Sequence, residues 1–195
     1  MYKLCFIFLF LSFSCFSNSN AKNFVLTKSG ERIDVSPSFF KIDDNERCIF
    51  YKTLNGSKEV KMNFKDLDYL IIRNSKFKAF KFKDSNEIDG CFVLCESSNS
   101  SLIFKTASLD DSNTVHYEFF VVDQDLAILE NHKFDNLKST KSAWIRADIF
   151  GKIKFFFGNC TSLIERLSAY DINSFEDYNL RILAFFDLPL FISCL

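Results

Sequence analysis

Residues 48–64 have the sequence CIFYKTLNGSKEVKMNF, in which two short runs flank an Asn-Gly pair. Asn55-Gly56 is the strongest two-residue signal for a hairpin turn in the chain, because both residue types tolerate positive φ. Residues 48–51 and 59–64, on either side of it, have the length and apolar content of strands. This segment therefore predicts an antiparallel hairpin and a β-rich fold.

The same pattern extends from Phe24 to about Phe134. A first hairpin is predicted for residues 24–26 and 32–35, with Gly30 in the turn between them. Short apolar runs separated by Asn, Asp, Gly and Ser predict further strands at residues 69–72, 76–83, 91–96, 101–106, 117–122 and 127–129. Their regular spacing is typical of an antiparallel β-meander or a small barrel-like sheet.

The hydrophobic period becomes helical after Thr140. Ile145, Ile149 and Ile153 recur once per helical turn and share one face. Residues 162–165, Ser-Leu-Ile-Glu, match a capping box and predict a second helix, and a third is expected from about Ser174. The chain is therefore predicted to be an α+β protein with a β-rich region at 22–138, followed by two or three C-terminal helices in a region at 139–195, packed as one unit.

Residues 1–21 have the pattern of a secretory signal peptide. Lys3 precedes the apolar stretch 4–13, and a Ser-x-Ala site predicts cleavage near Ala21-Lys22. The apolar stretch has about half of the roughly 20 residues that a membrane span needs. We therefore predict a secreted, periplasmic or outer-envelope protein with no transmembrane span after signal removal. Cys15, which follows Ser14, leaves lipidation open as an alternative.

The charge balance argues against a nucleic-acid partner. The chain has 24 basic and 25 acidic residues, a net charge of −1, and loss of Lys3 with the leader changes it to −2. Nucleic-acid binding would require a strongly basic face. A hydrophobic content of 48% predicts a folded core rather than a disordered chain.

Five of the seven cysteines remain after the predicted cleavage: Cys48, Cys91, Cys95, Cys160 and Cys194. An odd number in an oxidising compartment leaves at least one thiol free or paired between chains. Cys91 and Cys95 are four residues apart, about 13 Å along a regular strand, which is too far for a shared metal ion or a mutual disulfide. We predict no metal and no other cofactor; core packing, or a disulfide from this pair to Cys48, Cys160 or Cys194, remains open.

Residues 76–83, KFKAFKFK, form the most distinctive run. A bulge near Ala79-Phe80 would place Lys76, Lys78, Lys81 and Lys83 on one face of a strand. Such a stripe could contact an anionic partner, for example lipopolysaccharide or an acidic glycan. The favoured alternative is an edge strand whose lysines prevent aggregation.

Three segments resemble an uncharacterised family of exported proteins of Bacteroidota-type bacteria. They are VLTKSGERI at 25–33, FKDLDYL at 64–70 and FFGNCTSL at 156–163, and the last has Thr161 where the family usually has proline. The family has no assigned activity. The resemblance therefore implies export and the order of strands and helices.

No cluster of residues in the sequence predicts a catalytic site. The five glycines are scattered, which argues against a phosphate-binding loop. We therefore predict an exported envelope protein that acts as a non-enzymatic binding or interaction module, with an envelope protein or an anionic glycan as partner. The alternative is an exported hydrolase whose site is assembled from scattered residues.

Overall fold

The computed structural model describes residues 23–107, 115–135, 142–170, 185–186 and 189–194. The predicted signal peptide and nearly all of the predicted third helix lie outside these ranges. Within them, the elements are β1 (Phe24–Thr27), β2 (Arg32–Asp43), β3 (Cys48–Thr53), β4 (Glu59–Asn63), β5 (Leu67–Ile72), β6 (Ser75–Phe80), β7 (Asp89–Glu96), β8 (Ser100–Ala107), β9 (His116–Asp123), β10 (Ile128–Asp135), α1 (Ser142–Phe157), α2 (Thr161–Ser168) and β11 (Ile192–Ser193).

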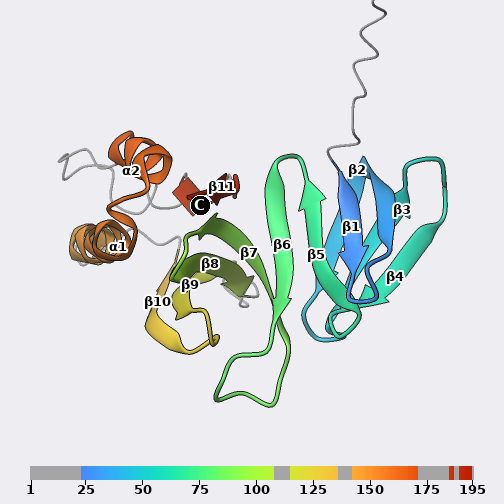
Figure 1. The fold of residues 1–195 in the computed structure, drawn as a ribbon, viewed down its shortest axis with the longest axis horizontal. Helices are drawn as coiled ribbons and strands as arrows, with labels where there is room; N and C mark the ends of the chain where they lie inside the picture. The colour runs from blue at the N-terminus through green and yellow to red at the C-terminus, as the bar shows by residue number, and fades with distance from the viewer. Residues whose placement is uncertain (1–22, 108–114, 136–141, 171–184, 187–188, 195) are drawn as a thin grey trace, which may run out of the picture.

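The strands form one curled sheet, shown in Figure 1, with the order β10-β9-β8-β7-β6-β5-β1-β2-β3-β4. Every pair along this path is antiparallel. Strand β11, near the C-terminus, pairs in parallel with β7. The prediction of an antiparallel meander followed by helices is thus confirmed in outline, but the sheet is open rather than a closed barrel.

Both predicted hairpins form, with different turns. Gly30 has φ of +87°, the conformation for which glycine is favoured, between β1 and β2. Neither Asn55 nor Gly56 has a positive φ, and the N–H of Gly56 donates to the carbonyl of Thr53 at 3.1 Å. The loop between β3 and β4 is therefore wider than the two-residue turn that Asn-Gly predicts.

Two hydrophobic clusters divide the molecule into two lobes (Figure 1). Strands β1 to β6 surround the first, whose largest side chains include Tyr51, Phe64 and Phe77. The second lies between one face of β7 to β10 and the helices, and its centre contains Phe119 and Phe186. A smaller cluster covers the opposite face of β6 to β9. Because β7 to β9 are covered on both sides, their residues are apolar in long runs rather than in alternation.

The buried faces of the two helices are the predicted ones, but the N-cap of α2 is a different residue from the one predicted. Ile149, Ile153 and Phe157 of α1 are buried, as are Leu163 and Leu167 of α2. The residue that caps α2 is Cys160, with no side-chain hydrogen bond, so the predicted capping box at 162–165 was wrong. Neither described helix is long and apolar enough to cross a membrane.

The predicted bulge in β6 was also wrong. Residues from Lys76 to Phe80 pair with β7 without a register shift, and β6 lies between β5 and β7 rather than at an edge. Phe77 contacts the first cluster, whereas Phe80 belongs to the cluster on the other face of β6 to β9. The change of phase in this run thus reflects burial on both faces. The strand ends at Phe80, before Lys81 and Lys83.

Candidate functional site

The face of β7 to β10 that points away from the helices carries a cavity of about 320 Å³, which we call the sheet pocket. Its lining combines strand residues with the loop between β6 and β7. The members are Phe82, Lys83, Asp84, Ser85, Asp89, Lys105, Glu118, Phe120, Ile128 and Lys133. This is the small end of the range for ligand sites, and the lining combines six charged side chains with two phenylalanines.

The sheet register brings the charged side chains of the sheet pocket together. Lys105 on β8 is directly opposite Glu118 on β9, which in turn pairs with Lys133 on β10. The Lys105 Nζ lies 3.3 Å from Asp89 Oδ1 and 4.0 Å from Glu118 Oε2. Lys133 Nζ lies 3.4 Å from Glu118 Oε1. The side chain of Lys133 is 75% exposed and that of Glu118 is 11% exposed, so the pocket has a buried carboxylate and a solvent-facing ammonium.

The electrostatics of the sheet pocket keep Lys105 charged. Burial disfavours its ammonium, but the carboxylates of Asp89 and Glu118 outweigh that effect and raise the pKa of Lys105 above its ordinary value of 10.5. Its Nζ also lies 5.7 Å from the centre of the Phe120 ring, within the range of a cation–π contact. A general acid or base at neutral pH needs a pKa near 7, so Lys105 is suited to binding rather than to proton transfer.

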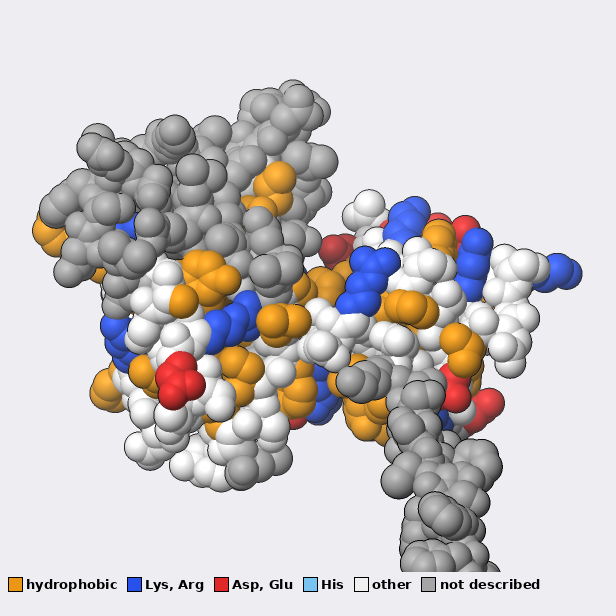
Figure 2. Space-filling view, turned by 90° about the horizontal axis from the view of Figure 1, so that it is seen from above, with side chains coloured by type: hydrophobic (Ala, Val, Ile, Leu, Met, Phe, Trp, Pro, Cys, Tyr) orange, Lys and Arg blue, Asp and Glu red, His pale blue; other side chains and the backbone are white. Residues whose placement is uncertain are grey.

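The four lysines predicted to form a stripe are dispersed. Lys76 Nζ lies 2.5 Å from Glu96 Oε2, with only 13% of its side chain exposed. The Lys78 Nζ lies 5.6 Å from the centre of the Phe80 ring, and Lys81 is exposed just after the end of the strand. Of the four, Lys83 lines the sheet pocket. On the face shown in Figure 2, the Lys and Arg side chains of the described residues are spread over both lobes rather than gathered into one band.

The two cysteines of the Cys-x-x-x-Cys segment lie on opposite faces of β7. The pairing of β7 with β8 shifts register between Val93 and Cys95. Cys91 consequently packs with the cluster away from the helices, and Cys95 packs with the helix-side cluster. The two therefore share no site, as predicted, although the reason is the bulge as well as the spacing.

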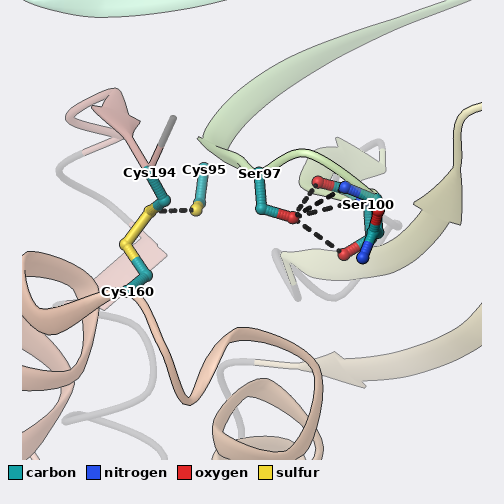
Figure 3. The surroundings of a disulfide bond; sticks show 6 residues. Cys95, Ser97, Ser100, Cys160 and Cys194 are labelled. Carbon is teal, nitrogen blue, oxygen red and sulfur yellow. Dashed lines mark hydrogen bonds between the residues drawn. A yellow bond between two sulfur atoms is a disulfide. The ribbon is translucent and has the colours of Figure 1, made fainter.

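Cys95 instead lies beside a disulfide between Cys160 and Cys194, whose Cα atoms are 5.3 Å apart (Figure 3). The Cys95 Sγ is 3.0 Å from the Cys194 Sγ, and the three sulfurs all lie within 4.8 Å of one another. Cys48 and Cys91 are buried free thiols. A disulfide to Cys95 or Cys91 was one of the open alternatives, whereas the structure joins Cys160 to Cys194 and leaves Cys95 as a thiol.

The sequence did not predict the sheet pocket, because no two of its central charged residues belong to the same sequence motif. Asp89, Lys105, Glu118 and Lys133 come from four different strands. A carboxylate within the apolar part of a strand, such as Glu118 between Tyr117 and Phe119, was the available signal.

Comparison with known proteins adds no relative: no family model matches the chain, and neither the curated proteins nor the solved structures contain a match.

Proposed function

We propose that the protein is an exported, non-enzymatic binding module of the bacterial cell envelope, and that its sheet pocket binds a short segment of an anionic glycan. The observation that carries the proposal is the lining of the pocket. Three lysines and three carboxylates line it together with Phe82 and Phe120.

A lining with both lysines and carboxylates suits a ligand with both acidic groups and hydroxyls. Sugar hydroxyls can donate to the carboxylates of Asp89 and Glu118, while an acidic group of the glycan accepts from Lys83 and Lys133. A simple anion would meet the three carboxylates as well as the three lysines, with no net attraction from the lining. A chain of sugars with occasional acidic groups uses both kinds of side chain.

Two further features support export. The sequence of residues 1–21 predicts a cleaved leader. The Cys160–Cys194 disulfide is of the kind that persists in oxidising compartments and is rare in the cytosol.

The test is calorimetric titration with an oligosaccharide of uronic acids and with its neutral counterpart. Lys83→Gln/Lys133→Gln removes two cationic groups of the lining without truncating the buried Glu118. We expect this double variant to bind the acidic oligosaccharide about tenfold more weakly, equivalent to about 1.4 kcal/mol, and the neutral one unchanged.

The matched control is Lys28→Gln/Lys58→Gln, which removes two exposed lysines far along the chain from the pocket residues. The control should bind like the unaltered protein. Equal affinity of both double variants for the acidic oligosaccharide, or no binding by the unaltered protein, would refute the proposal. Release of new reducing ends during the titration would instead favour the exported hydrolase.

A further inference from the structure

A short C-terminal segment, residues 189–194, contacts both the sheet and α2, and we call it the C-terminal strap. Its backbone is bonded to the sheet and to one of its turns: the N–H of Cys194 donates to the backbone carbonyl of Glu96 on β7, and the N–H of Phe191 donates to that of Asn74 between β5 and β6, each at 2.9 Å. It is also held by the helices, because Arg166 of α2 donates to the carbonyl of Leu190 at 3.0 Å. Cys194 therefore lies where strap, sheet and helix meet.

Two cysteines from different elements approach Cys194 at this point (Figure 3). Cys160, the residue that caps α2, is disulfide-bonded to it. Cys95 lies on β7, the strand that pairs with the strap, and its sulfur is 3.0 Å from that of Cys194. In the structure, which contains the Cys160–Cys194 bond, the strap is already paired with the strand that carries Cys95.

We propose that Cys194 is a shared disulfide partner, and that exchange from Cys160 to Cys95 transfers the covalent anchor of the C-terminal strap from α2 to the sheet. In this step, the Cys95 thiolate attacks the Cys194 sulfur. The Cys95–Cys194 bond forms as the Cys160–Cys194 bond breaks, and Cys160 leaves as a thiolate that takes up the proton lost by Cys95. The number of disulfides is unchanged, so neither an oxidant nor a reductant is consumed.

The exchange is slow in the resting protein. Burial, with a smaller contribution from Glu96, raises the pKa of Cys95 to about 12, so at neutral pH only a minute fraction is the attacking thiolate. The Cys160–Cys194 bond therefore persists until local opening of the structure exposes Cys95 to water or to a small thiol.

The consequence of exchange is that α2 is no longer covalently joined to the C-terminal strap. The Cys160–Cys194 bond closes a loop between residues 34 apart in sequence, and its loss removes a restraint on α2. The inference concerns this anchor and is independent of the glycan proposal.

The decisive experiment uses the unaltered chain. It is equilibrated at pH 8 with a catalytic amount of reduced glutathione, quenched in acid, alkylated and digested for disulfide mapping by mass spectrometry. We expect both the Cys160–Cys194 and the Cys95–Cys194 peptide pairs. A map that contains only Cys160–Cys194 after equilibration would overturn the proposal, as would a Cys95–Cys160 pair in place of Cys95–Cys194.

A matched pair of variants tests the release of α2. Cys95→Ser permits only the helix anchor at Cys194, and Cys160→Ser permits only the sheet anchor. Hydrogen exchange of residues 161–168 should be at least about tenfold faster in Cys160→Ser than in Cys95→Ser. Equal protection of α2 in the two folded variants would show that the exchange has no effect on the helix.

Discussion

At the scale of single residues, Gly90 of β7 shows how closely the first cluster is packed. A Cβ at this position would lie 2.4 Å from the Cζ of Phe77 and 2.5 Å from the Cζ of Phe64, distances that real contacts do not reach. Both rings are buried and cannot swing into solvent. We therefore expect Gly90→Ala to lower the free energy of unfolding by about 1–3 kcal/mol, measured by urea denaturation.

The matched control for Gly90→Ala is Gly151→Ala in α1. Gly151 is exposed, and nothing lies within 4 Å of the place where its Cβ would be. Alanine has the higher helix propensity, so this change should raise stability by up to about 1 kcal/mol. Similar effects of the two substitutions would show that β7 does not pack against Phe64 and Phe77 as described.

Residue-scale features were the least predictable from sequence. Spacing along the chain predicted that Cys91 and Cys95 share no site. It could not select the pair Cys160–Cys194, because those residues, 34 apart in sequence, meet only once the strap lies beside α2, where Arg166 donates to the carbonyl of Leu190. The sheet pocket was unpredictable for the same reason. Lys105 and Glu118 become neighbours only once the register of β8 and β9 is known.

At the scale of elements, α1 is joined to β10 by an ion pair between Lys152 and Glu130, beside a contact of His132 with Asp148 that is an ion pair only when the imidazole is protonated. Lys152 Nζ of α1 lies 2.6 Å from Glu130 Oε1 of β10. The hydrogen bond from Lys152, with help from His132, lowers the pKa of Glu130 below its ordinary value of 4.5. A lowered carboxyl pKa means that the pair's stabilisation is complete above the unfolded-state value and is lost as pH falls through the folded-state value.

We therefore expect Glu130→Gln to be less stable than the unaltered protein at pH 7, and the difference to shrink as the pH falls below 4.5 and through the lowered folded-state pKa of Glu130. Urea midpoints across this range measure it. The effect should be smaller than that of Gly90→Ala, because both partners are partly exposed and are screened by salt. Glu59→Gln, on the exposed β4, is the control. A deficit of Glu130→Gln that persists at low pH would mean that the charge pair is not its source.

The elements themselves were largely predictable, with errors where burial deviates from simple alternation. The hairpins β1–β2 and β3–β4 and the buried faces of α1 and α2 follow from local turns and periods. Strand β2 extends to Asp43, beyond the prediction, since Pro37 and the serines beside it interrupt the apolar pattern. Strand β10 extends to Asp135 for a similar reason: its polar residues, such as Glu130, contact α1 rather than a hydrophobic core.

At the scale of the whole molecule, Phe92 of β7 couples the two lobes. It packs against both the first cluster and the helix-side cluster. Its ring centre lies 5.3 Å from that of Phe77 in the first cluster and 5.5 Å from that of Phe104 in the helix-side cluster. Aromatic contacts of this kind contribute about 0.5–1.5 kcal/mol each beyond the area they bury, so one side chain can make unfolding of the lobes cooperative.

Phe92→Ala should therefore separate the unfolding of the two lobes. Among the described residues, the helix-side cluster has seventeen buried members and the first cluster nine, so the lobe of β1 to β6 should unfold first. The measurement compares two signals in urea: alkylation of Cys48, buried in β3, and helical circular dichroism from α1 and α2. In the unaltered protein and in Phe50→Ala, whose ring belongs to neither cluster, we expect one midpoint for both signals. In Phe92→Ala, Cys48 should become reactive at a lower urea concentration than that at which the helices are lost.

Coincident midpoints of the two signals in Phe92→Ala would contradict this prediction. They would mean that the lobes are coupled through the continuous hydrogen bonding of β5 to β7, since those strand pairs are unaffected by loss of the ring.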